Sequence, residues 1–303
     1  MQKGFSFQFW IIVSFMMLYI VWGTTYLAIA IGLESFPPFF MAGLRFIIAA
    51  VALLGYSIIS GEGLPNKKSI IKNTILGFVI LTGGQGLLIW SEQYIASGFA
   101  SILIATLPIW FVIIDRSNWS YYFNNKLILV GLVLGFGGIL VLFNDQLTAE
   151  LPAETIKMNV IASLAVIIGG VFWVSGTLYN RSKPAYATIS QSLGWQLLSG
   201  ALLCFVISGV LGEFPRLEPA EVATKSWMAV LYLSLVSNVG AFIAYTFLLK
   251  NLPSAIVGTY AYINPIVAVL LGWMIADEVI TLQQIIGMAI ILFSAVLINL
   301  NRK

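Results

Sequence analysis

The chain has 303 residues, of which 60% are hydrophobic and 9% are charged, and its formal net charge is +3. A soluble domain carries about a quarter charged residues, so a soluble body of this length could not cover its surface with so few charges. The 15 basic residues are scattered along the chain, which excludes the basic stripe of a nucleic-acid-binding protein.

Apolar runs long enough to cross a bilayer follow one another from the first residues to the last. About twenty mostly apolar residues cross the hydrocarbon core as a helix, and polar segments separate ten such runs. The expected spans are residues 10–32, 38–60, 74–95, 97–115, 127–144, 158–180, 189–211, 226–249, 253–276 and 281–300. The sequence therefore predicts an all-α membrane protein with ten transmembrane helices.

The basic residues outside these spans divide unevenly between the two sides of the membrane. If the N-terminus lies in the cytoplasm, eleven of them lie inside, and only Lys157, Arg216 and Lys225 lie outside. Cytoplasmic loops of membrane proteins are enriched in Lys and Arg. We therefore expect both termini in the cytoplasm, which requires an even number of spans.

The two halves of the chain contain similar segments. FASILIATLP at residues 99–108 aligns with IVGTYAYINP at residues 256–265, an offset of 157 residues. Such an offset suggests duplication of a five-helix unit, with residues 1–144 and 158–303 as the copies and the acid-rich residues 145–157 as an extracytoplasmic link. Because five is odd, the second copy would enter the membrane from the opposite side, which is the inverted repeat of many secondary carriers.

Several of these segments together resemble a known family. They are VWGTTYLAI (21–29), GLRF (43–46), WSEQYIASGFASILIATLP (90–108), FWVSGTLYNR (172–181) and LPSAIVGTYAYINPIVAVLLGWMIADE (252–278). In this order and spacing the chain resembles the EamA type of the drug/metabolite transporter superfamily over nearly its whole length. The resemblance implies a ten-helix inverted-repeat carrier of bacterial inner membranes, with a substrate cavity between the halves and export of amino acids or related metabolites as the typical activity.

Two charged residues in the expected spans are candidates for function, because charge inside a membrane is costly. Arg45 in the second span could bind a carboxylate or phosphate group. It could instead extend to the outer interface or hydrogen-bond to helix carbonyls. Glu92, near the outer end of the third span, could bind a coupling proton or balance Arg45 or a substrate amine, but it could equally cap the turn to the next helix. The sequence leaves open whether the two side chains meet.

Polar and aromatic residues nearer the middle of the spans complete the candidate site. A buried amide in hydrocarbon needs a partner, which a wet pathway would supply. Besides Arg45 and Glu92, the candidate substrate-binding residues are Trp22, Tyr26, Gln85, Trp90, Trp173, Asn238, Tyr245, Tyr260 and Asn264. Pro108 and Pro265 stand at equivalent places in the two copies and would bend helices four and nine, either as hinges or as static bends.

Catalytic and cofactor-binding patterns are missing from the sequence. The chain has no His, which is the commonest general base and metal ligand, and no phosphate-binding loop of the G-x-x-x-x-G-K-[ST] type. We therefore expect neither an enzyme nor a cofactor or metal site. The favoured interpretation is a secondary transporter of a small amphiphilic metabolite, an amino acid first, with membrane lipid and possible coupling protons as further partners. A membrane-embedded enzyme and a channel-like facilitator are the alternatives.

Overall fold

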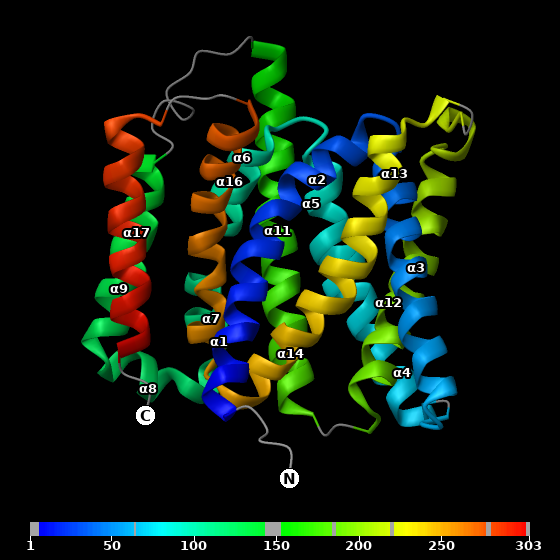
Figure 1. Ribbon diagram of the computed structural model, residues 1–303, viewed down its shortest axis with the longest axis horizontal. Coiled ribbons are helices and arrows are strands. Elements are labelled where there is room, and N and C mark those ends of the chain that lie inside the picture. The colour runs from blue at the N-terminus through cyan, green and yellow to red at the C-terminus, as the bar shows by residue number, and fades with distance from the viewer. Residues whose placement is uncertain are drawn as a thin grey trace.

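The computed structural model describes residues 6–63, 65–142, 153–183, 186–218, 221–276 and 280–300, and these residues form helices joined by short turns, with no strand among them. Figure 1 shows the helices standing side by side in one bundle. The first residues of α1 and the last residues of α17 lie at the same end of it. The predicted link between the halves falls partly outside the described residues, and its last residues belong to a helix.

The first half of the chain forms five helical rods, several of them built from successive segments. In chain order these are α1 (Phe7–Met17) with η1 (Leu18–Trp22) and α2 (Gly23–Leu33); α3 (Pro38–Ile59); α4 (Lys67–Leu76) with η2 (Gly77–Gly86) and α5 (Leu87–Ser91); α6 (Ser97–Ile104) with α7 (Leu107–Ile114); and α9 (Lys126–Leu142), which follows the short η3 (Arg116–Asn118) and α8 (Trp119–Asn124). The segments η1 and η2 are π-helical.

The second half repeats this order. Its rods are α11 (Ala153–Ser182); α12 (Ile189–Val210); α13 (Thr224–Leu231) with η6 (Tyr232–Ala241) and α14 (Phe242–Asn251); α15 (Ser254–Gly258) with α16 (Tyr260–Ala276); and α17 (Leu282–Leu300). The short 3-10 helix η4 (Phe214–Arg216) lies between α12 and α13. The third rod of each half therefore contains a ten-residue π-helical segment, and the fourth rod of each half is broken into two helices.

Eight of the described helical stretches are long and apolar enough to cross a bilayer, so the chain is a multi-pass membrane protein. The helix α9 becomes a ninth if it is counted with α8, from which it is bent by 93°. The apolar part of α17, Leu282–Ile298, is shorter. Every predicted span contains a helical rod, but the count of ten membrane crossings stays a prediction.

Local sequence explains where several helices begin and end. Asn66 caps α4 by accepting a hydrogen bond from the Ser69 amide at 2.9 Å, and Thr188 with Gln191 forms a capping box at the start of α12. Pro38 opens α3, where its missing N–H costs no helical hydrogen bond. Gly61 follows the end of that helix with a φ of +76°, a conformation that other residues rarely adopt.

The main contacts between rods follow a pattern that repeats after five rods. The second rod (α3) lies along the seventh (α12), and the fifth (α9) lies along the tenth (α17). The first rod packs against the eighth and the ninth, as the sixth rod (α11) packs against the third and the fourth. Each of these contacts is thus matched by one in which both partners are shifted by five rods.

Some of these rods approach each other closely because glycine lies between them. A Cβ atom on Gly77 would stand 2.3 Å from the carbonyl oxygen of Gln196, so any larger residue there would push η2 away from α12. Gly131 and Gly135 of α9 face Ile298 and Tyr262 in the same way. The small residues of the G-x-x-x-G spacing in α9 thus serve helix packing.

Candidate functional site

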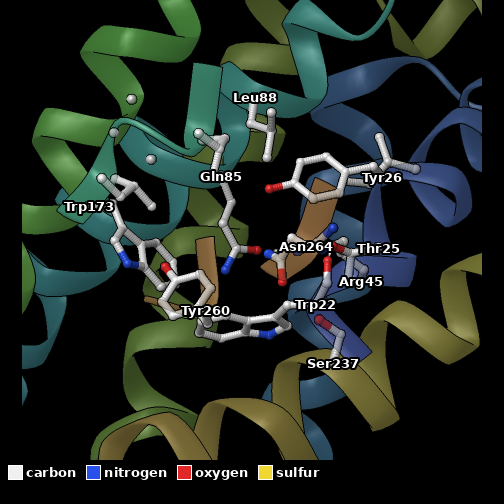
Figure 2. Close-up of a pocket in the computed structure, with 16 residues that line it drawn as sticks. Trp22, Thr25, Tyr26, Arg45, Gln85, Leu88, Trp173, Ser237, Tyr260 and Asn264 are labelled. Carbon is white, nitrogen blue, oxygen red and sulfur yellow. Dashed lines mark hydrogen bonds between the residues drawn. The ribbon is translucent and has the colours of Figure 1, made fainter. Parts of the chain in front are cut away.

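A cavity with an empty volume of about 580 Å³ lies between the two halves, and we call it the central cavity. Its walls come from the first four rods of the first half and from α11, η6 and α16 of the second (Figure 2). The predicted residues that line it are Trp22, Tyr26, Arg45, Gln85, Trp173, Tyr260 and Asn264. Seven side chains that are far apart in the sequence thus face one space.

Arg45 is buried in the wall of the central cavity, with 3% of its surface exposed. Its Nη2 atom donates hydrogen bonds to the Gln85 Oε1 atom and, at 3.3 Å, to the Asn238 Oδ1 atom. Its Nε and Nη1 atoms have no hydrogen-bond partner among the described residues. The guanidinium therefore does not extend to the interface, and neutral amides alone leave part of its hydrogen-bonding capacity unused.

The two amides that meet Arg45 belong to π-helical segments. Gln85 lies in η2 and Asn238 lies in η6. Trp22, the last residue of η1, lines the same cavity. A π-helical turn shifts the side chains that follow it around the helix axis, and such turns are frequent at functional sites. Three local distortions of otherwise regular rods therefore converge on this cavity.

Further polar groups in this region also keep unused hydrogen-bonding capacity. The Asn264 Oδ1 and Asn238 Nδ2 atoms are buried without a partner in the described part of the chain. Asn264 lies next to the Tyr26 hydroxyl group, which is itself buried. A buried polar group without a partner costs free energy, so a bound polar molecule that pairs with these atoms would be favoured.

Four aromatic side chains pack together at one end of the central cavity, and we call them the aromatic partition. The Trp22 ring centroid lies 4.7 Å from Tyr260, 5.0 Å from Tyr245 and 5.6 Å from Trp173. The Tyr245 hydroxyl accepts a hydrogen bond from Trp173 Nε1 at 3.1 Å and shares another with Thr177 Oγ1 at 3.1 Å. Trp22, Trp173 and Tyr260 line the central cavity, whereas Tyr245 lines a second cavity on the far side, so these packed rings separate the two spaces.

Trp90 and Glu92 do not line the central cavity. The Trp90 ring lies 5.1 Å from the Tyr94 ring, near the end of the rod. Glu92 stands at the C-cap of α5 and is half-buried, but both carboxylate oxygens are buried and lack a hydrogen-bond partner among the described residues. Burial raises the pKa of this carboxyl group well above its ordinary range, and the positive charge of Arg45 lowers the pKa in part. No ion pair joins Arg45 and Glu92; among the described residues the ion pair is between Lys225 and Glu34.

The two candidate hinge prolines occupy different positions in their rods. Pro108 lies in the first turn of α7, just after the break that separates α6 from α7. Pro265 lies inside α16, six residues after the break at Thr259. Both rods are thus interrupted close to a proline, but whether they bend during function stays a prediction.

The comparison with known families supports the resemblance seen in the sequence. The sequence model of the EamA-like transporter family matches residues 9–144 and again residues 160–300. The chain belongs to the EamA-like transporter family. The resemblance is therefore confirmed, and it points to a transporter rather than to an enzyme.

Relatives of this EamA-like chain include proteins that are themselves called transporters. "Uncharacterized inner membrane transporter YedA" of Escherichia coli K12 is 30% identical over 286 residues, which cover 94% of this chain and 89% of that protein. "Uncharacterized transporter YoaV" of Bacillus subtilis is 24% identical over 273 residues, or 90% of each chain. A solved crystal structure with 18% identity superposes with a TM-score of 0.74 over 95% of this chain and 96% of the other, which shows a common fold.

Several residues that line the central cavity of this EamA-like protein were not predicted. Besides three glycines, they are Ile29, Leu88, Ile104, Leu107 and Ser237. Ile29 follows Trp22 and Tyr26 at helical spacing, and Leu88 follows Gln85 by three residues, so the helix period could have indicated them. Apolar residues at the same period are usual in lipid-facing and packed positions, which is why the pattern by itself is weak.

Proposed function

We propose that this protein is a secondary transporter that moves a small amphiphilic metabolite with a carboxylate group through the central cavity by alternating access. The observation that carries the proposal is the buried Arg45 guanidinium, whose Nε and Nη1 atoms are unpartnered in the described part of the chain. A buried cation is strongly destabilising unless an anion or several acceptors compensate it. A substrate carboxylate would supply two acceptors and the opposite charge at once.

An amino acid is the first candidate for this substrate. The Asn264 Oδ1 atom, which lacks a partner in the described structure, is an acceptor that an ammonium group could use. The aromatic partition supplies apolar faces for a side chain, and aromatic faces also attract ammonium groups. The family resemblance implies export as the direction of transport.

The inverted-repeat architecture is part of the proposal. The family matches the chain twice, and the most extensive contacts between rods have counterparts in which both partners are shifted by five. The third rods share a π-helical segment, and the fourth rods share a break. These regularities support two five-helix copies related by a two-fold axis, which in carriers lies in the membrane plane.

We further propose that both termini lie in the cytoplasm of a bacterium, with the protein in the inner membrane. The first and last described helices, α1 and α17, begin and end at the same end of the bundle. In the expected topology most of the basic loop residues also lie on that side of the membrane. One relative is called an inner membrane transporter. A reporter fused to each terminus and assayed on both sides of the membrane tests this orientation.

A carrier explains the aromatic partition better than a channel does. A channel needs a continuous wet path when it conducts, whereas a carrier needs a barrier on one side of its site at every moment. Trp22, Trp173, Tyr245 and Tyr260 supply such a barrier on one side of the central cavity. Opening would require these rings to separate.

Transport by purified protein in liposomes tests the proposal. A panel of labelled amino acids identifies the substrate, and counterflow separates carrier from channel because only a carrier accelerates uptake of label when unlabelled solute is loaded inside. Failure of every carboxylate-bearing solute, with transport of a neutral or cationic one, would refute the role given to Arg45.

Proton coupling through Glu92 is a second hypothesis about the same transporter. The buried carboxylate oxygens of Glu92 and the raised pKa of this group support it. The substitution Glu92→Gln removes the titrating group and keeps its shape. Transport that still follows an imposed pH gradient in Glu92→Gln would dismiss the hypothesis.

A further inference from the structure

A second and larger cavity, with an empty volume of about 1150 Å³, lies on the other side of the aromatic partition. It lies between α4, the end of α11, the start of α12 and the end of α14, at the end of the bundle where α1 begins (Figure 1). We call it the basic vestibule, because Lys72, Arg181, Lys183 and Lys250 line it and no carboxylate does among the described residues.

Two acidic residues stand near the basic vestibule without cancelling its charge. Glu62 accepts hydrogen bonds from Thr188 and Ser190 at the rim. Asp115 lines a neighbouring cavity together with Arg181 and accepts hydrogen bonds from Ser117, Asn118 and Tyr122. If both acids are counted against the four cations, an excess of two positive charges is left.

The exposure of the cations decreases from the mouth of the vestibule to its interior. Lys183 and Lys250 are exposed, whereas Lys72 is 9% exposed. The Lys72 Nζ atom donates to the carbonyl oxygens of Asn180 at 3.3 Å and of Lys183 at 3.5 Å, so its charge is held at the end of α11. A cleft lined by charges of one sign focuses the electric field and raises the local concentration of ions of the opposite sign.

The deep wall of the vestibule adjoins the proposed transport path. Tyr245, Phe242 and Thr177 line it, and the Tyr245 ring lies 5.0 Å from Trp22, which lines the central cavity. An anion held in the vestibule is therefore separated from the central cavity by the packed rings of the aromatic partition. It would reach the cavity that contains Arg45 as soon as the partition opened.

We propose that the basic vestibule is an access site for soluble organic anions that bear a carboxylate or phosphate group. It gathers them at the end of the bundle where the chain begins and presents them to the aromatic partition. The role of this site in transport rests on the proposed function, whereas anion binding in the vestibule does not. The same chemistry is found in anionic lipid headgroups, so the experiment separates the two sources.

Charged thiol reagents measure the potential inside the vestibule without knowledge of the substrate. Cysteine is introduced in separate variants at Thr246 and at Ser192, which line the vestibule from two helices, and at Ser120, an exposed residue of α8 at the same end of the bundle. The native Cys204 is buried and serves as the unlabelled background. Each variant in nanodiscs of zwitterionic lipid is reacted with an anionic and with a cationic methanethiosulfonate.

The ratio of anionic to cationic reaction rates is expected to be several-fold higher at Thr246→Cys and Ser192→Cys than at Ser120→Cys. In water, one unit charge about 8 Å away changes the local concentration of a monovalent ion about twofold, so Lys250→Gln should lower the ratio about fourfold at low salt. Lys183→Gln should act alike. Lys126→Gln removes a cation at the same end of the bundle but outside the vestibule. It should leave the ratio at Thr246→Cys and Ser192→Cys unchanged.

Competition by ligands then identifies what the site binds. Inorganic phosphate or glutarate, added at constant ionic strength, should slow the anionic reagent at Thr246→Cys and not at Ser120→Cys. Slowing by phosphatidylglycerol in the nanodisc, with none by phosphate or glutarate, would assign the site to lipid and overturn the proposal. An equal ratio at all three cysteines, or one insensitive to Lys250→Gln and Lys183→Gln, would overturn it as well. These rates do not depend on Arg45, so the vestibule and the proposed transport function can fail separately.

Discussion

The central cavity and the basic vestibule both present cations, but in opposite surroundings. In the central cavity one guanidinium, Arg45, is buried among amides and aromatic rings. In the vestibule four cations share a much larger space, and three of them are exposed. Water and ions screen the second set and cannot screen the first, so one buried charge should matter more than several exposed ones.

Among these substitutions, Arg45→Gln should have the largest effect on transport. Removal of one member of a buried, hydrogen-bonded charge pair costs about 2–5 kcal/mol, so transport of a carboxylate substrate should fall by roughly 30-fold or more, mainly through weaker binding. The measurement is initial uptake into proteoliposomes over a range of substrate concentrations. Arg45→Lys, which keeps the charge without the planar fork, should recover part of the activity. Equal activity of Arg45→Gln and the unaltered protein would mean that the two cavities do not differ as described.

Tyr245→Phe tests the layer that divides the two cavities. The ring stays in place, while the hydrogen bonds with Trp173 and Thr177 are lost. At about 0.5–1.5 kcal/mol for each bond, the unfolding free energy should fall by about 1–3 kcal/mol, which appears as a lower melting temperature.

Tyr245→Ala removes the ring itself and should connect the two cavities. A cysteine at Ser237, which lines the central cavity and is buried, should then react faster with a thiol reagent added from the vestibule side. Tyr245→Phe is the matched control and should leave that rate slow. Similar rates in both variants would show that Tyr245 is not part of the barrier.

The substitution Glu92→Gln tests how a buried acid near the other end of the central cavity affects the pH dependence of stability. Its pKa is raised in the folded protein, so the folded state holds a proton that the unfolded state has released between the two pKa values. Its stabilising contribution is therefore full below the usual carboxyl range and is lost as the pH rises towards the raised pKa. Over this window the stability of the unaltered protein relative to Glu92→Gln should fall by at most about 1.4 kcal/mol per pH unit. Melting temperatures of both proteins from pH 4 to 8 check the sign. A melting temperature of the unaltered protein that rises with pH relative to that of Glu92→Gln would contradict the prediction.

The exposed ion pair between Lys225 and Glu34 should give the smallest effect. Their side chains are 60% and 50% exposed. Exposed pairs contribute about 0–1 kcal/mol and are screened by salt, so Lys225→Gln should lower the melting temperature slightly at low salt and not at high salt. A larger loss of transport activity in Lys225→Gln than in Arg45→Gln would reverse the ranking of buried and exposed charges.

The sequence predicted the positions of the rods well because membrane insertion depends on a local property. Each apolar run must satisfy its backbone hydrogen bonds within itself, so its length and the polar segments beside it set a helix without reference to the rest of the chain. The boundaries at Lys67 and Ala153 were missed by five or more residues, because charged first turns extend these helices beyond their apolar parts.

The sequence by itself determined that this is an all-helical, multi-pass membrane protein of the EamA type, and it indicated Arg45, Gln85 and Asn264 as polar residues that a bilayer would not tolerate without partners. Only the tertiary structure decided which of them meet. Arg45 contacts Gln85 and Asn238 rather than Glu92, Tyr245 lies between two cavities, and four cations from separate rods form the basic vestibule. The physical reason is that a helix makes its own backbone bonds locally, whereas the rotation, π-helical shifts and glycine contacts that aim its side chains depend on the neighbouring rods.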